Sequence, residues 1–348
     1  MANDPIRIGI VGAGANTKLR HIPGFQDIDG VEVVSVCNRS RESGQRVADE
    51  FGILKVYDHW TDLVEANDTD AICIGTWPYL HCPVTLASLA VGKHVLTEAR
   101  MAMNGAEART MLDASRRRPD LVTQIVPTTL SLPFDRTITD MIAAGYLGDI
   151  LAVEVRGPGN DFMAKDRRMH WRHDQDLSGY NILNMGIRYE AMIRWVGPAV
   201  SVMAMTSINV ARRRNAEGLL QTVTVPDHVE VLCRLTSGAQ AHLSVSAVTG
   251  LARVPETWIF GSEGTLFLES ASEGWILRGS KPGDKELTEI KPPADKQGGW
   301  RVEEEFINAI RGNELVKHTT FETGVKYMEF SEAVTRSAQS GKAVALPL

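Results

Sequence analysis

The sequence predicts an α/β fold in which a doubly wound parallel sheet is followed by a second α+β domain on a largely antiparallel open sheet. In the first third of the chain, short continuous apolar runs alternate with helical patterns. This alternation is typical of a parallel sheet that is covered on both faces. After Pro127, strand-like segments with period-2 alternation follow one another across short turns, such as Thr236-Ser237-Gly238. Such turns favour antiparallel pairing.

The first domain, residues 1–127, is expected to bind a dinucleotide. Its sheet is expected to be of the Rossmann type, because crossovers between parallel strands are almost always right-handed. Its expected strands are 6–11, 31–37, 71–74, 94–96 and 121–126. Its expected helices are 43–51, 83–91 and 106–117.

The second domain is expected to comprise residues 128–348. Its expected helices are 134–144, 302–310 and 324–340. Its expected strands are 150–156, 201–206, 229–235, 239–247, 257–260 and 265–269. The polar stretch 279–299 is expected to be an exposed loop region.

Composition agrees with a globular protein of two domains. The chain has 348 residues, of which 43% are hydrophobic and 23% are charged. The net charge of −6 argues against a nucleic-acid partner, which needs a basic face. The short runs Arg116–Arg118 and Arg212–Arg214 are most simply helix-end or loop residues.

The four cysteines indicate a reducing compartment and no metal site, because they show no metal-ligand spacing. No apolar stretch approaches the ~20 residues that span a bilayer. The first strand begins by Ile6, which leaves no room for a signal peptide ahead of the fold. We therefore expect a cytoplasmic protein with no membrane partner.

A glycine-rich turn follows the first strand and predicts a dinucleotide site. Gly12 permits a tight turn, and Gly14 lets the backbone approach a pyrophosphate at a helix N-terminus. Ala15 and Asn16 continue this turn, and Thr17 stands where the fingerprint has its third glycine.

The end of the second strand favours NADP over NAD. Asn38 stands where an NAD enzyme usually has an acidic residue for the ribose 2′-hydroxyl, so no negative charge repels a 2′-phosphate. Arg39, Ser40 and Arg41 follow, and all three could bind that phosphate. The alternative is that they only begin the next helix.

Several motifs in order along the chain resemble the glucose–fructose oxidoreductase, inositol dehydrogenase and rhizopine-catabolism (Gfo/Idh/MocA) family. Besides the glycine turn, they are residues 75–81, 92–98, 148–150, 171–172, 179–195, 320–324 and 341–344. The resemblance covers nearly the whole length. It implies hydride transfer between NAD(P) and a sugar, polyol or similar small molecule. It also implies that the second domain binds the substrate and that its sheet forms the interface of a homodimer or homotetramer.

The resemblance also implies roles for single residues. Thr76, Trp77 and His81 would flank the cofactor, and Glu98 would lie near the nicotinamide ribose. Trp77 replaces a small residue or proline, so its ring either shapes the pocket near the nicotinamide or packs on the surface.

The usual proton-handling residues of that family are absent. Its Lys, Asp and His are replaced by Ala99, Asn184 and Arg188. Alanine cannot accept a proton, asparagine does not titrate, and arginine stays protonated. Arg188 can instead stabilise a negatively charged oxygen or bind a carboxylate. We therefore expect Arg188 and Asn184 to be catalytic.

Other polar residues near this motif are candidates for the missing roles. His170 is a candidate acid or base, although a solvated surface role is an alternative; His173 and Tyr180 lie nearby. Arg100, Arg172 and Tyr189 are expected to contact the substrate, and Arg168 adds a further charge that suits an anion.

Three functions follow from these observations. The first is an NAD(P)-dependent oxidoreductase of carbohydrate metabolism with a non-standard proton relay. The second is a cofactor-binding subunit without dehydrogenase activity. The third is a hydrolase or lyase that uses tightly bound NAD(P) for transient oxidation.

Overall fold

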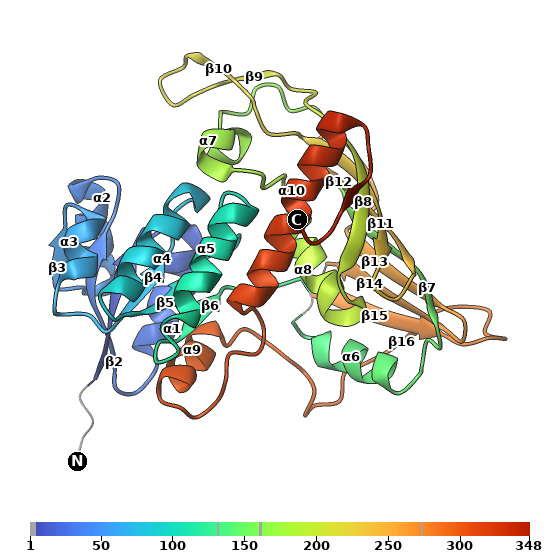
Figure 1. Cartoon of the computed structure of the whole chain (residues 1–348), viewed down its shortest axis with the longest axis horizontal. Coiled ribbons are helices and arrows are strands. Elements are labelled where there is room, and N and C mark those ends of the chain that lie inside the picture. The colour runs from blue at the N-terminus through green and yellow to red at the C-terminus, as the bar shows by residue number, and fades with distance from the viewer. Residues whose placement is uncertain (1–4, 131, 160–161, 273) are drawn as a thin grey trace. The chain divides into compact units, whose positions relative to one another are not determined.

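The computed structural model describes residues 5–130, 132–159, 162–272 and 274–348 (Figure 1). The chain forms two compact units. The first consists of the chain up to Pro127 together with Arg301–Val325, and the second of Thr128–Trp300 together with Lys326–Leu348.

The segment Arg301–Val325 belongs to the first unit, although the sequence assigned it to the second domain. It carries helix α9 (Val302–Ile310), whose Phe306 ring lies edge-on to Phe25 at 6.3 Å between ring centroids. An amphipathic pattern shows that a helix has an apolar face but does not identify the sheet that this face covers.

The first unit has a six-stranded sheet of order β3-β2-β1-β4-β5-β6, in which every pairing is parallel. This order confirms the doubly wound Rossmann prediction. The strands are β1 (Ile6–Val11), β2 (Val31–Cys37), β3 (Lys55–Tyr57), β4 (Ala71–Ile74), β5 (His94–Thr97) and β6 (Thr123–Ile125). The three-residue strand β3 could not be located from the sequence, because so short a run has no distinct pattern.

Helices cover both faces of this sheet, which explains its continuous apolar strands. Ile8, Ile10, Ile72 and Val95 are fully buried. The helices are α1 (Ile22–Gln26), α2 (Arg41–Phe51), α3 (Trp60–Glu65), α4 (His81–Ala90) and α5 (Gly105–Arg116).

The second unit has a nine-stranded sheet of order β16-β15-β14-β13-β7-β12-β11-β8-β17. All its pairings are antiparallel except that of β7 with β12, which confirms a largely antiparallel sheet. The strands are β7 (Ile150–Gly157), β8 (Ala199–Ser207), β11 (His228–Leu235), β12 (Gln240–Ser246), β13 (Glu256–Gly261), β14 (Thr265–Ala271), β15 (Gly274–Ser280), β16 (Thr288–Glu289) and β17 (Val344–Ala345). A separate ribbon pairs β9 (Arg212–Arg214) with β10 (Leu220–Thr222).

One face of the nine-stranded sheet is covered by helices. The helices of this unit include α6 (Asp135–Ala143), α7 (Gln175–Ser178), α8 (Met185–Val196) and α10 (Phe321–Ser340), the last of which starts in the first unit. On the covered face, the Ala204 backbone N–H donates to Ser337 Oγ of α10 at 2.9 Å. On the other face, Met203, Met205 and Leu232 are 51%, 77% and 62% exposed.

In the part of the chain that the structure describes, no helix combines the length and the apolar character needed to cross a bilayer.

Candidate cofactor and substrate sites

A cavity of about 580 Å³ opens at the carboxyl ends of β1, β2 and β4. Ligands of doubly wound sheets bind at this edge, where the strand order reverses between β1 and β4. Of the residues predicted to bind the cofactor, the cavity is lined by Gly12, Gly14, Asn38, Arg39, Ser40, Thr76 and Trp77. The first unit therefore brings together the glycine turn, the end of β2 and the end of β4.

The glycine turn tolerates Thr17 because a different glycine makes room for it. Thr17 is buried, and its hydroxyl donates to the Gly12 carbonyl at 3.3 Å. A Cβ atom on Gly75 would lie 2.1 Å from Thr17 Oγ1. Gly12 has a φ of +88° and also lacks space for a side chain. The imperfect fingerprint is thus completed by Gly75, which follows β4.

Asn38 links the glycine turn to helix α2. Its Oδ1 accepts the Ala13 backbone N–H at 2.7 Å, and its Nδ2 donates to Ser43 Oγ at 3.0 Å. Ser40 is the N-cap of α2, since its hydroxyl accepts the Ser43 backbone N–H. Ser40 therefore has the capping role that was the alternative to phosphate binding.

The two arginines around Ser40 differ in their contacts. Arg41 forms an exposed ion pair with Asp58 at 2.8 Å. The Arg39 guanidinium lies over the Trp77 ring, 5.7 Å from its centroid. Arg39 and Trp77 both line the cavity. That the Trp77 ring shapes the part of the pocket near the nicotinamide stays a prediction.

His81 does not reach the cavity, contrary to the expected cofactor contact. It is fully buried, and its ring nitrogens lie 2.9 Å from the Arg100 carbonyl and 3.0 Å from the Thr76 carbonyl. Burial lowers the pKa of His81. Its role is to hold the segment that carries Thr76. Arg100 is itself only 4% exposed.

Glu98 lies directly after β5, beside the end of β4. Its Oε1 accepts from Asn16 Nδ2 at 2.5 Å and lies 3.1 Å from His21 Nε2. The His21 Nδ1 in turn lies 2.5 Å from Glu303 Oε1. Sequence reasoning missed His21 and Glu303, because the two residues are 282 positions apart. Ala15 is exposed on the same turn.

In the second unit, Arg188 and Asn184 lie together at the start of α8. Arg188 is 5% exposed, and its Nε donates to Asn184 Oδ1 at 3.1 Å. Its guanidinium lies against Gly157, where a Cβ atom would be 2.2 Å from Arg188 Nε. Burial lowers the pKa of Arg188 to about 10, so the side chain remains a cation at neutral pH. No carboxylate of the described residues pairs with it.

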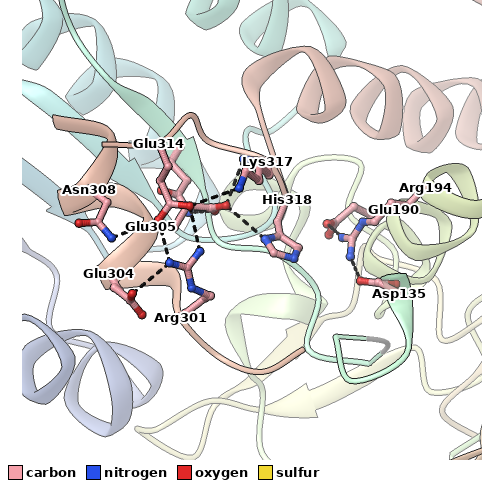
Figure 2. A network of polar contacts seen from close by, with 11 residues as sticks. Asp135, Glu190, Arg194, Arg301, Glu304, Glu305, Asn308, Glu314, Lys317 and His318 are labelled. Atoms are coloured by element: carbon pink, nitrogen blue, oxygen red, sulfur yellow. Dashed lines mark hydrogen bonds and ion pairs between the residues drawn. The ribbon is translucent and has the colours of Figure 1, made fainter. Parts of the chain in front are cut away.

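Arg194, on the same helix, has acidic partners. It pairs with Asp135 and with Glu190, the latter at 2.5 Å (Figure 2). Asp135 also accepts from Trp195 Nε1 at 2.7 Å. Arg194 is therefore a structural cation, whereas Arg188 has an amide neighbour in place of an acid.

The ion network of the first unit in Figure 2 is also structural. Arg301 pairs with Glu314 at 2.7 Å and with Glu304 at 3.0 Å. Glu305 accepts from Gln124 Nε2 at 2.9 Å and from the Lys317 backbone N–H at 3.1 Å. The bond from Gln124 of β6 attaches the segment 301–325 to the parallel sheet, and the other bonds lie within the segment.

Tyr189 is not a substrate contact, contrary to the sequence-based expectation. It is 1% exposed, stacks on Phe330 at 3.6 Å between ring centroids, and accepts the Ala199 backbone N–H on its hydroxyl. Since α8 turns by about 100° per residue, adjacent residues face different directions. Both side chains are buried, but Tyr189 packs on Phe330, whereas Arg188 lies against Gly157 and Asn184.

His170 has a local structural contact. It is exposed and caps the 3-10 turn Trp171–His173, because its Nδ1 accepts the Arg172 backbone N–H at 3.3 Å. Burial and the charge of Arg172 lower the pKa of His170. The exposed Arg172 guanidinium lies 4.1 Å from the centroid of the Trp171 ring.

Comparisons with known proteins agree with these two units. Residues 6–125 match the oxidoreductase family with an NAD-binding Rossmann fold, and residues 136–267 match the GFO/IDH/MocA C-terminal domain. The trans-1,2-dihydrobenzene-1,2-diol dehydrogenase of Bos taurus is 27% identical over 260 residues, which cover 72% of this chain and 74% of that protein. An uncharacterized oxidoreductase of Synechocystis is 22% identical over 273 residues, which cover 76% of this chain and 72% of that protein.

Solved structures show the same fold. A levoglucosan dehydrogenase in complex with NADH and L-sorbose has a TM-score of 0.85 at 20% identity, covering 98% of this chain and 99% of that one. The WlbA dehydrogenase of Bordetella pertussis, in complex with NADH and UDP-GlcNAcA, has a TM-score of 0.80 at 23% identity, covering 99% of both chains. Together, the two family matches cover more than half of the sequence. The chain therefore belongs to the Gfo/Idh/MocA family of oxidoreductases, whose N-terminal domain is an NAD-binding Rossmann fold.

Proposed function

We propose that the protein transfers a hydride between NAD(P) and a small polyhydroxyl compound that carries an acidic group, such as a sugar acid. The observation that carries this proposal is Arg188, a buried cation without a carboxylate partner among the described residues. The substrate's acidic group, or the oxygen that becomes negatively charged during the reaction, is the proposed partner.

The energetics of buried charge support this role. Removing an ion from water costs several kcal/mol unless an opposite charge or good hydrogen bonds offset it. The single Asn184 bond leaves most of the Arg188 donors for a ligand. A guanidinium binds a carboxylate through two parallel hydrogen bonds and also stabilises an alkoxide-like oxygen.

The residues of the first unit suit the cofactor that would supply or accept the hydride. The glycine turn has no room for side chains at Gly12, and the cavity lies at the edge where such sheets bind ligands. Glu98 and the backbone of the turn are proposed to bind its ribose and pyrophosphate. The proton must be handled by a group other than Ala99 or Asn184.

NADP is the proposed cofactor, with NAD as the alternative. Arg39 and Arg46 both line the cavity, and Asn38 adds no negative charge there. Arg39 is already oriented over the Trp77 ring, so its guanidinium loses little freedom when it binds a phosphate.

The names of similar proteins support a carbohydrate-like substrate. Levoglucosan dehydrogenase is solved with NADH and L-sorbose, and the WlbA dehydrogenase with NADH and an acidic nucleotide sugar, UDP-GlcNAcA. A sugar acid satisfies both this carbohydrate chemistry and the charge of Arg188.

A panel of matched compounds tests the proposal. Each aldonic or uronic acid is assayed beside the neutral sugar of the same stereochemistry, with NADP⁺ or NADPH. We expect turnover of at least one acid, at a kcat/KM at least tenfold above that of its neutral partner. Turnover of neutral sugars alone would contradict an acidic substrate and leave the developing negative oxygen as the partner of Arg188.

A cofactor-binding subunit without dehydrogenase activity is the second candidate, favoured by Ala99 and Asn184 at the family's Lys and Asp positions. The triple change Ala99→Lys, Asn184→Asp and Arg188→His separates the two. Activity on simple polyols in the variant, with no turnover of any panel compound by the parent, would favour the subunit.

A further inference from the structure

A buried histidine lies between two carboxylates at the edge of the parallel sheet. His21 is fully buried. Its Nδ1 lies 2.5 Å from Glu303 Oε1, and its Nε2 lies 3.1 Å from Glu98 Oε1. Glu303 is 3% exposed and comes from α9, which returns to this unit late in the chain. His21 thus links the end of β5 to α9.

A π-helical turn brings His21 to this place. The helical run 15–26 contains such a turn at Thr17–His21. In an α-helix, residues five apart point about 140° away from each other, whereas the wider π-turn, with hydrogen bonds between residues five apart, brings them closer to the same side. Asn16 and His21 are five apart, and their side-chain nitrogens lie 3.3 Å from one another. Both are directed at Oε1 of Glu98.

Glu98 lies beside the segment that lines the cofactor cavity, although it is not itself one of the lining residues. Its backbone N–H donates to the Ile74 carbonyl at 2.9 Å, so Glu98 lies beside the end of β4. The next residues of that segment, Gly75 and Thr76, line the cavity. The Glu98 side chain is 17% exposed. Its Oε2 has one contact in the described structure, the Ala99 backbone N–H at 3.3 Å, and can accept a further hydrogen bond.

We propose that His21 is a positioning residue: as an imidazolium held by Glu303, it orients Glu98 so that the second carboxylate oxygen accepts a ribose hydroxyl of the cofactor. This inference rests on the proposed function, because it takes NAD(P) as the ligand of the cavity. It adds His21 and Glu303 to the residues that determine cofactor binding, although neither reaches the cavity itself.

The charge state of His21 decides whether this orientation holds. A neutral imidazole has a single N–H, and the closer carboxylate, Glu303, would keep it on Nδ1. The Nε2 lone pair would then face Oε1 of Glu98 and repel it. Burial opposes the cation, but the hydrogen bonds to Glu303 and Glu98 outweigh it and raise the pKa of His21 to about 9. The proposed orientation is therefore lost as the pH rises through about 9.

The other titratable groups around His21 do not compete with it in this pH range. Cys73 of β4 is buried near both carboxylates, and its pKa is raised well above the usual value, so it stays a neutral thiol. Burial lowers the pKa of His81, which therefore stays neutral. On the turn itself, Lys18 pairs with Glu50 at 2.5 Å, and Arg20 is partly exposed.

The test is calorimetric binding of NADPH and NADH to the full chain between about pH 6.5 and pH 10, with folding checked by circular dichroism at each pH. We expect the Kd to be constant up to about pH 8. It should then rise at least fivefold, that is, binding should weaken, as one proton is lost from His21 near pH 9. In parallel, the imidazole of His21 is titrated by NMR in the absence of nucleotide.

Glu303→Gln removes the carboxylate on the Nδ1 side of His21 and changes no residue that lines the cavity. It should therefore lower both midpoints, that of the Kd change and that of the NMR titration of His21, by at least one pH unit. Glu305→Gln is the matched control, since Glu305 is equally buried on the same helix but bonds to Gln124 and Lys317. It should lower stability and leave both midpoints near 9. His21→Gln should weaken binding and abolish the pH dependence.

The outcomes separate the two proposals. NAD(P)H binding that is independent of pH, or midpoints that are unchanged in Glu303→Gln, would overturn the role of His21 and leave the oxidoreductase proposal standing. An absence of NAD(P)H binding at every pH would overturn the oxidoreductase proposal, and with it the ligand that His21 is proposed to serve.

Discussion

Two buried cations, one in each unit, differ in how their charge is balanced. His21 in the first unit lies between Glu98 and Glu303, so the protein itself supplies its counter-charges. Arg188 in the second unit has an asparagine and a glycine as neighbours. A buried charge needs compensation, and His21 finds it within its own unit. For this reason we propose that the counter-charge of Arg188 comes from a ligand, with Arg188 as the functional cation and His21 as a support.

Arg194→Met should cause the largest loss of stability. It would leave the buried Asp135 and Glu190 without their cation, which costs about 3–5 kcal/mol for a broken buried pair. Chemical unfolding followed by circular dichroism measures it. Arg188→Met is the matched variant on the same helix and should leave stability unchanged or raise it, because no carboxylate of the described residues pairs with that cation. Equal destabilisation by the two variants would contradict the distinction between Arg194 as a structural cation and Arg188 as a ligand-binding one.

Arg188→Ala should reduce kcat/KM by about 100- to 1,000-fold on the true substrate, the range for one lost oxyanion donor. NADPH affinity should stay within about twofold, because the cofactor cavity is lined by the first unit. Steady-state kinetics and nucleotide titration check both values. Wild-type turnover would refute the role of Arg188 and move attention to His170 and His173.

The charge of His21 should make stability depend on pH. Its pKa is about 9 in the folded protein and 6.5 when unperturbed, so the folded state binds the proton more tightly. The contribution, on the order of 3 kcal/mol, is fully present below about pH 6.5 and is lost as the pH rises through about 9. Urea unfolding at several pH values should show this decline in the wild type and not in His21→Gln. A flat wild-type profile would speak against a charged His21.

Asn38→Asp should shift cofactor preference towards NAD(H) by about tenfold, or about 1.4 kcal/mol. The aspartate can still accept the Ala13 N–H and the Ser43 hydroxyl, so the turn should keep its shape. Its charge would repel a 2′-phosphate. Fluorescence titration with both nucleotides measures the ratio, and tighter NAD(H) binding by the wild type would remove the proposed phosphate site.

The open face of the nine-stranded sheet should form the interface of a homodimer or homotetramer with closed symmetry. Met203 of β8 pairs with Leu232 of β11, and Met205 lies further along the same face. A double change, Met205→Glu with Leu232→Glu, should shift sedimentation towards the monomer. A monomeric wild type at micromolar concentration would contradict this prediction.

The parallel sheet and most of its helices could be predicted because their patterns are local. Continuous apolar runs such as 71–74 have one plausible environment, a strand covered on both faces. The glycine turn and the polar residues after β2 and β4 were predicted for the same reason. Roles within α8 were less predictable, because Arg188 and Tyr189 are adjacent in sequence and only packing separates the core from the proposed site.

The sequence by itself determined the fold class and the position of the glycine turn, and it led to the prediction that Ala99, Asn184 and Arg188 replace the family's Lys, Asp and His. These depend on residue type and spacing along a short stretch of chain. The tertiary structure decided that Gly75 makes room for Thr17, that α9 returns to the parallel sheet, and that Glu303 meets His21. Each of these contacts joins segments that are distant in sequence. Whether a buried charge is balanced depends on the neighbours that such packing places beside it.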